Sequence, residues 1–170
     1  MIDYSLFKRI EDYAIQHAGS SIRVYAQRNQ NLNSIVINCI RGKVAEYCCY
    51  FSMIEAGYTL ESEPDLKIYE ESKKNYDADL ICIGKDGVMY DEKRHIHVKS
   101  VSRETYNRYG ASVLIESNDP IVKYPQENHY FSIMLQHSLT HYTFYKWLNS
   151  FDCEWRDPIL NLPSKRALYL

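Results

Sequence analysis

The sequence lacks the patterns that identify several large classes of protein. It contains no run of ~18 apolar residues that could span a membrane, and the opening Met1-Ile2-Asp3-Tyr4 does not resemble a signal peptide. It has no Gly-rich phosphate loop, no nucleophile elbow and no Ser-His-Asp order. We therefore expect a cytoplasmic protein without a membrane partner, whose chemistry uses none of these devices.

Cysteine pairing is also not indicated. The chain has an odd number of cysteines and no Cys-x-x-Cys motif. All but the last lie in apolar stretches, which favours buried free thiols in a reducing compartment over disulfides or a zinc site. The five are Cys39, Cys48, Cys49, Cys82 and Cys153.

Neither charge nor composition is extreme. The chain has 170 residues, of which 45% are hydrophobic and 25% charged, with a formal net charge of −2. This is typical of one soluble domain over residues 1–170 that buries its own core. The acids gather at residues 55–71, and the basic residues lie elsewhere, so one basic face is permitted. The basic clusters are at 23–28, 41–43, 93–108 and 165–166.

Two helices are expected in the first third of the chain. Apolar residues at helical spacing predict a short amphipathic helix at 3–17, ended by residues 19–21. The segment up to residue 33 could be helix or loop. A longer helix is expected over 33–56, from Asn33 as N-cap to a C′ Gly57. Its expected buried stripe is Ile40, Val44, Tyr47, Phe51 and Ile54, with Glu46 at the edge.

A β-hairpin is the most informative feature. Strands are expected at 78–84 and 88–99, joined by an Asp-Gly turn at 86–87 and preceded by a short strand near 58–60. Because side chains alternate across a strand, the second strand turns His95, His97 and Lys99 to one face. Ile96 and Val98 then point into a core.

The later elements complete a mixed fold. We expect a helical turn at 103–110, strands at 111–116 and 121–124, and a long helix at 128–149. The tail after residue 149 is interpreted as irregular. The order of elements predicts an α/β fold in which helices flank a mixed β-sheet, with a core at about 33–149.

Three residues in this pattern suit phosphodiester hydrolysis. That reaction needs charge neutralisation at the phosphate and an activated water. Glu46 on the long helix, Asp79 before the first hairpin strand and Lys99 at the end of the second could supply a Mg²⁺ site and a cation. This arrangement resembles the PD-(D/E)xK nuclease superfamily. Gly42-Lys43-Val44-Ala45-Glu46 resembles its G-x-x-x-E helix, and His97-Val98-Lys99 its (D/E)-x-K motif.

The resemblance implies a restriction-endonuclease-like core and a role for each residue. It implies that Asp79 and Glu46 hold the metal with the backbone carbonyl of Val98, and that Lys99 positions the water and stabilises the transition state. Asp77 is an alternative to Asp79. The expected ion is Mg²⁺, with Mn²⁺ as a substitute.

One position departs from the superfamily. His97 stands where the second acidic residue should be. A neutral histidine can hold a water or a softer ion, but it does not supply the negative charge that Mg²⁺ favours. A zinc site made by His95 and His97 with Asp77 or Asp79 is a weaker alternative.

The resemblance also implies a partner. We expect a metal-dependent endonuclease acting on double-stranded DNA as a homodimer, of the homing or restriction-like kind that phages and other mobile elements carry into a bacterial host. The alternatives are a nuclease-like fold that binds nucleic acid or a protein without cutting, and an RNA-directed nuclease. The candidate DNA contacts are Arg41, Lys43, Ser100, Arg103, Tyr106 and Arg108.

Overall fold

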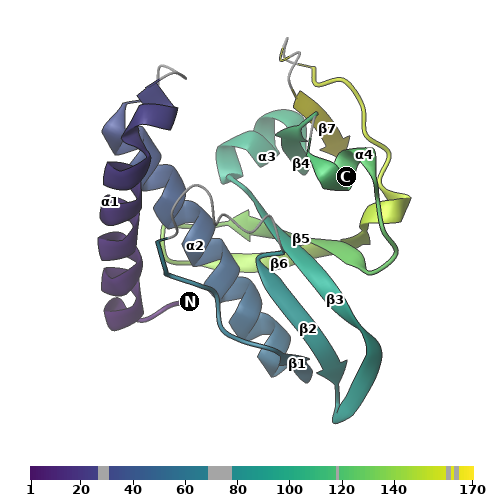
Figure 1. The fold of residues 1–170 in the computed structure, drawn as a ribbon. Helices are drawn as coiled ribbons and strands as arrows, with labels where there is room; N and C mark the ends of the chain where they lie inside the picture. The colour runs from purple at the N-terminus through teal and green to yellow at the C-terminus, as the bar shows by residue number, and fades with distance from the viewer. Residues whose placement is uncertain (27–30, 69–77, 118, 160–161, 163–164) are drawn as a thin grey trace.

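The structure is a computed structural model that describes residues 1–26, 31–68, 78–117, 119–159, 162 and 165–170 (Figure 1). Its elements follow one another as helices, a strand meander, and then alternating short helices and strands. They are α1 (Tyr4–Ala26), α2 (Leu32–Glu55), β1 (Tyr58–Leu60), β2 (Leu80–Lys85), β3 (Val88–Val101), α3 (Arg103–Tyr109), β4 (Ser112–Glu116), α4 (Pro120–Lys123), β5 (His129–Gln136), β6 (Tyr142–Asn149), a 3₁₀ turn (Ser150–Asp152) and β7 (Lys165–Tyr169).

The main sheet is mixed, as expected. Its five strands lie in the order β1-β2-β3-β5-β6, and only β3 and β5 run parallel. Strands β4 and β7 form a separate antiparallel pair. With four α-helices in the described part of the chain, the fold is mixed α/β.

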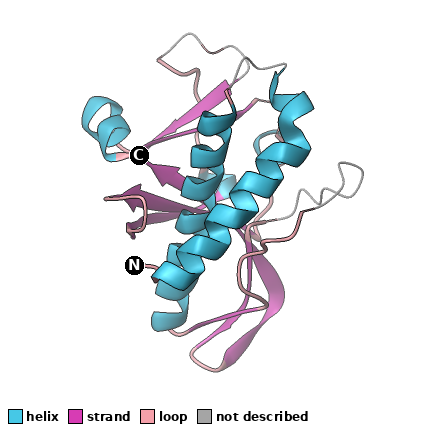
Figure 2. Ribbon diagram, turned by 90° about the vertical axis from the view of Figure 1, so that its left-hand side faces the viewer, coloured by secondary structure: helices cyan, strands magenta, loops and turns pink. Residues whose placement is uncertain are grey.

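The main sheet is covered on both faces. Helix α2 packs on one face with α1 beside it, and their apolar side chains form one core with Ile96 and Val98 of β3 (Figure 2). The other face carries Val101, Phe131 and Ile133, which pack against β4, β7 and α4 in a second core. Strand β3 therefore contributes to both cores through its alternating side chains.

Side-chain caps fix where the two long helices begin. Asp3 Oδ1 accepts a hydrogen bond from the backbone N–H of Leu6, and Asn31 Oδ1 from that of Ser34. Helix α1 does not end at residues 19–21 as expected, but runs to Ala26. A helical glycine costs only about 1 kcal/mol, and the fully buried stripe of α1 continues up to Ala18.

The expected stripe of α2 is correct at its start and wrong at its end. Ile40, Val44 and Tyr47 are buried, whereas Phe51 and Ile54 are 40% and 45% exposed. The inner face of the helix shifts to other residues because α2 packs against both α1 and the sheet. These are Ala45, Cys48, Cys49 and Met53.

The hairpin forms as predicted. Asp86 and Gly87 both have positive φ, 50° and 81°, as the two-residue turn requires. Near this turn β3 lies very close to Gly84 of β2, where an added Cβ would be 2.6 Å from the Val88 carbonyl oxygen.

The helix expected at 128–149 is wrong. The segment is an antiparallel hairpin of β5 and β6. Strand β5 pairs on both sides and is buried on both faces, so its apolar run lacks the alternation of a half-exposed strand. Strand β6 is rich in aromatic residues, which favour strands. The helical spacing of the apolar residues across β5 and β6 is therefore coincidental.

Two smaller expectations are also wrong. Residues 120–123 form the short helix α4 rather than a strand, because Asp119 caps it and Pro120 fits a first helical turn. The tail is not wholly irregular, since β7 pairs with β4 and buries Ala167 and Leu168. No described helix combines the length and the apolar character needed to cross a membrane.

Two glycines give opposite expectations for stability. Gly84→Ala should destabilise the protein by about 1–3 kcal/mol, since its Cβ would overlap the Val88 carbonyl. Gly19→Ala, at a helical position with nothing within 4 Å, should stabilise it by about 0.5–1 kcal/mol. Urea unfolding of both variants checks this. A loss of stability in Gly19→Ala would contradict a continuous α1.

Candidate functional site

Glu46 and Lys43 form a buried pair on the inner side of α2. Lys43 Nζ donates a hydrogen bond to Glu46 Oε2 at 2.7 Å, and their side chains are only 18% and 11% exposed. The ring of Tyr13 on α1 lies 5.7 Å from the ammonium group. Glu46 was expected only at the edge of the buried stripe, so the packing of α1 against α2 encloses it more than the helical pattern indicates.

Asp79 is held where β2 begins. Its Oδ2 accepts a hydrogen bond from the backbone N–H of Val98 at 2.7 Å. The backbone N–H and C=O of one strand residue point to the same side of the strand. The Val98 carbonyl is therefore directed toward the same edge as the N–H that binds Asp79. The β2–β3 ladder starts with Leu80 opposite Ile96, one residue pair away from Asp79.

The two carboxylates lie close enough to influence each other. Burial and the charge of Asp79 raise the pKa of Glu46 to about 8, although Lys43 and Lys99 act in the opposite direction. Burial also raises the pKa of Asp79, opposed by Lys99, by the Val98 N–H and by Lys43. The fold therefore brings Glu46, Asp79 and Lys99 together, with Lys43 as a fourth member. We call these four residues the carboxylate–lysine cluster.

Cys49 lies near the two carboxylates but is not activated as a nucleophile. Burial raises the pKa of the Cys49 thiol to about 12, and its sulfur donates a hydrogen bond to Ser132 Oγ. The described cysteines are all free, and Cys48, Cys49 and Cys82 are buried. These three thiols match the expectation of buried, unpaired cysteines.

His97 shares a strand face with Lys99, but its contacts are directed toward β5. A hydrogen bond of 2.9 Å joins its Nε2 to Nδ1 of His129, and its ring packs against Phe131 in the second core. Burial, together with the charge of Lys99, lowers the pKa of His97 to about 3. His97 is thus neutral at physiological pH, and these contacts join it to His129 and Phe131 rather than to Glu46 or Asp79.

His95 packs against His129 of the neighbouring strand. It is half-buried, and its ring stacks on His129 with centroids 4.6 Å apart. No hydrogen-bond partner for its buried Nδ1 is found in the described part of the chain. His129 was not predicted as a partner, because it falls in the segment that we expected to be helical.

The zinc alternative gains no support. Within residues 1–26, 31–68, 78–117 and the later described ranges, no three His, Cys, Asp or Glu side chains converge as a metal site would require. Asp77, the alternative metal ligand, lies outside the described residues.

A hard divalent ion fits the carboxylate–lysine cluster better. Two carboxylates and a backbone carbonyl are all oxygen donors, and Mg²⁺ usually takes one or two carboxylates and keeps several waters. A cation there would also offset the burial that raises the pKa of both carboxyl groups and the charge of Asp79 that raises the pKa of Glu46. The donors present at Glu46, Asp79 and Val98 therefore suit Mg²⁺ or Mn²⁺.

The candidate DNA contacts are spread over three elements. Arg103 and Arg108 are exposed on α3, Ser100 is exposed at the end of β3, and Arg41 is exposed on α2. Tyr106 is half-buried, and its ring makes an edge contact with Tyr145. The sixth candidate, Lys43, instead pairs with Glu46 in the carboxylate–lysine cluster.

We find no match for this chain among protein-family models, curated proteins or solved structures.

The buried Glu46 gives a pH-dependent expectation. Its folded-state pKa of about 8 lies above the ordinary 4.5. The stability it contributes is therefore present at low pH and is lost as the pH rises through 8. In EDTA, Glu46→Gln should become more stable than the parent as the pH rises from about 5 to about 9. Each 1 kcal/mol corresponds to about 2–4 °C in Tm for a chain of this size.

Thermal unfolding at several pH values checks this expectation. Glu55→Gln is the matched control, because Glu55 lies on the same helix but is exposed. Equal pH dependence in the two variants would show that Glu46 is not held in a charge-excluding environment.

Proposed function

We propose that this protein is a divalent-metal-dependent endodeoxyribonuclease of the PD-(D/E)xK type. The observation that carries the proposal is the buried meeting of Glu46 and Asp79 with Lys43 and Lys99. Two buried carboxylates are costly unless something compensates them. Strongly perturbed groups in such an arrangement are typical of functional sites.

The kinds of element present support this interpretation, although α3 precedes β5 in the chain. The resemblance implies a helix that donates a Glu, a hairpin that carries the Asp and the Lys, a further strand and a second helix. Helix α2, the β2–β3 hairpin, strand β5 and helix α3 can fill these places. The second helix is then α3, not the helix that we had expected at 128–149.

Each residue has a distinct part in the reaction. Glu46, Asp79 and the Val98 carbonyl would hold the ion. When bound, Mg²⁺ neutralises charge on the scissile phosphate and activates water. In hydrolysis a bond forms from the water oxygen to phosphorus, the bond to the leaving oxygen breaks, and that oxygen takes up a proton. Lys99 orients the water and stabilises the negative charge that develops on the phosphate.

Lys43 has a positioning role. Its ammonium group holds the Glu46 carboxylate through the 2.7 Å hydrogen bond and is itself half enclosed by Tyr13. It holds one oxygen of the carboxylate in place and lowers the free-energy cost of ionising it. The catalytic ammonium is then Lys99, for which no ion pair is formed among the described residues.

Removing the catalytic lysine tests the proposal. Lys99→Ala should lower metal-dependent DNA cleavage by about 10²-fold or more, since it removes charge stabilisation in the transition state. Supercoiled and linear DNA are incubated with the protein in Mg²⁺, Mn²⁺ or EDTA, and nicking is measured on gels. Lys93→Ala is the matched control: Lys93 lies on the same strand in an exposed ion pair with Glu61.

Cleavage that survives in Lys99→Ala would overturn the assignment of the site. Cleavage that persists in EDTA would overturn the metal requirement. Loss in both lysine variants would point to a general effect of charge on DNA binding.

The neutral His97 favours a second candidate function. A protein of this fold without the second acid could bind nucleic acid or a protein partner and not cut it. The observation that favours this alternative is that His97 contacts His129 and Phe131. Binding of DNA without cleavage in any metal, over several DNA sequences and structures, would support it over the nuclease.

A substitution at His97 tests whether this residue is a metal ligand or has only a structural role. His97→Gln keeps a neutral group that can hydrogen-bond His129, so cleavage should stay within a few-fold of the parent. Asp79→Asn removes a charged ligand and should abolish cleavage. Initial rates of nicking in Mg²⁺ compare the two variants. An equal loss in both would make His97 a member of the metal site.

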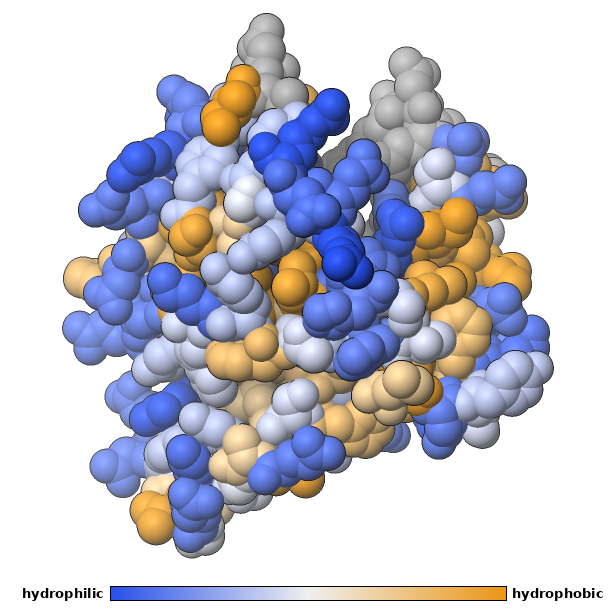
Figure 3. Space-filling model, turned by 180° about the vertical axis from the view of Figure 1, so that it is seen from behind, coloured by the Kyte–Doolittle hydropathy of each residue, from blue (hydrophilic) through white to orange (hydrophobic). Residues whose placement is uncertain are grey.

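A homodimer follows from the proposed reaction rather than from a visible interface. Cutting both strands of double-stranded DNA with one small domain generally needs two copies of the site. On the face shown in Figure 3, hydrophobic residues form separate patches between polar ones. A phage or mobile-element enzyme acting inside a bacterial cell remains the biological role that we propose by analogy.

A further inference from the structure

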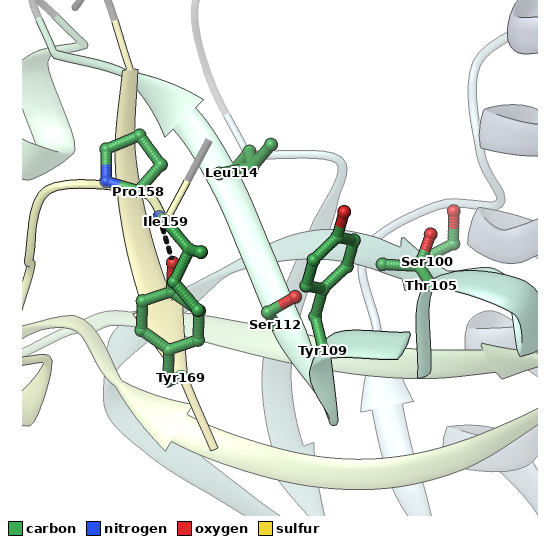
Figure 4. A pocket seen from close by; sticks show the side chains of 8 residues that line it. All are labelled: Ser100, Thr105, Tyr109, Ser112, Leu114, Pro158, Ile159 and Tyr169. Atoms are coloured by element: carbon green, nitrogen blue, oxygen red, sulfur yellow. Dashed lines mark hydrogen bonds between the residues drawn. The ribbon is translucent and has the colours of Figure 1, made fainter. Parts of the chain in front are cut away.

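A pocket lies beyond the end of β3 and is separate from the carboxylate–lysine cluster. Its volume is about 290 Å³. Figure 4 shows Ser100 of β3 and Thr105 of α3 at one end, Tyr169 of β7 at the other, and Tyr109 and Ser112 between them. Elements distant in the sequence therefore surround one hollow with five hydroxyl groups.

Two of these hydroxyls are already oriented. Tyr169 Oη accepts a hydrogen bond from the backbone N–H of Ile159 at 2.7 Å, which leaves its own proton to donate. Thr105 Oγ1 accepts from Ser102 Oγ at 2.9 Å, so its proton is also left for another acceptor. The pocket thus offers fixed donors.

The other three hydroxyls can adapt to a ligand. Ser100, Tyr109 and Ser112 form no side-chain hydrogen bond with another residue of the described part of the chain. Each hydroxyl can donate or accept by rotation. A ligand with both donors and acceptors on one edge would satisfy them.

The remaining lining defines the class of ligand. It is apolar, from Leu114, Pro158 and Ile159, and the lining residues that the structure describes include no charged side chain. The two tyrosine rings add aromatic surface. A neutral, planar ring with a hydrogen-bonding edge suits this lining, and the volume is near the lower end of the ~300–1,000 Å³ of small-molecule pockets. A single nucleobase has these properties.

We propose that this pocket receives one unpaired nucleobase of the DNA substrate. The inference rests on the proposed nuclease function. Ser100 follows Lys99 directly in β3, so the backbone at the edge of the pocket adjoins that of the candidate catalytic lysine, while alternation turns the two side chains to opposite faces of the strand. The exposed Arg103 and Arg108 of α3 are available for the phosphate backbone of the same strand.

A base in a paired duplex cannot enter such a pocket. It must be extruded or already unpaired, and extrusion costs least at a bulge, mismatch or single-stranded site. The substrate class that follows is DNA with an unpaired nucleotide near the scissile phosphate. Stacking on tyrosine is tolerant of sequence, so structure rather than base identity would be selected.

Binding in EDTA tests the pocket without cleavage. Three duplexes are compared by fluorescence anisotropy: one fully paired, one with a single unpaired thymine, and one with an abasic bulge at the same place. The parent should bind the thymine bulge about tenfold more tightly than the other two, as expected for one stacked base. Tyr109→Ala should remove this preference, and Tyr109→Phe and Thr105→Val should reduce it. Tyr124→Ala, at a 73% exposed tyrosine outside the pocket, should keep it.

The outcomes are distinguishable from those of the cleavage assay. Equal affinity for the thymine and abasic bulges, or an unchanged preference in a folded Tyr109→Ala, would overturn the base pocket even if the protein cleaves DNA. A thymine preference that depends on Tyr109 supports the pocket even if Lys99→Ala shows the nuclease to be misassigned. Tighter binding of free thymidine than of the bulged duplex would overturn the proposal that the ligand is a base of DNA. The pocket would then be assigned to a free nucleoside.

Discussion

The arrangement of this protein depends on one constraint, which is the burial of two neighbouring carboxylates, Glu46 and Asp79. Burial raises the pKa of both Glu46 and Asp79, and the charge of Asp79 raises that of Glu46 further. The fold offsets part of this cost with Lys43, with Lys99 and with the N–H of Val98. A protein selected only for stability would gain by replacing such groups with apolar ones, so their presence indicates a function for the charge.

Strand β3 transmits this constraint to the rest of the fold. Its Ile96 and Val98 side chains pack under α2, while His97 packs against Phe131 on the other face. The strand is therefore fixed from both sides, and so is the backbone N–H that holds Asp79. The candidate site depends in this way on two cores that share a single strand.

The sequence predicted the local features well and the long-range ones poorly. The β2–β3 hairpin was predictable because its turn demands Asp-Gly and its strands alternate. The burial of Glu46 was not, because it depends on how α1 packs across α2. The β5–β6 hairpin was missed since β5 is buried on both faces. That error also hid His129, the partner of His97, which only strand pairing brings near.

The absence of a second acid need not disable the proposed chemistry. With both carboxylates ionised, Glu46 and Asp79 balance Lys43 and Lys99, so the carboxylate–lysine cluster has a formal charge of zero. A bound divalent ion makes it positive, and the scissile phosphate is an anion. A third carboxylate in place of His97 would hold the ion more strongly but reduce that positive charge. In the proposed nuclease, a neutral His97 would therefore weaken metal binding but leave more positive charge to attract the phosphate, and the substrate would contribute more to holding the ion.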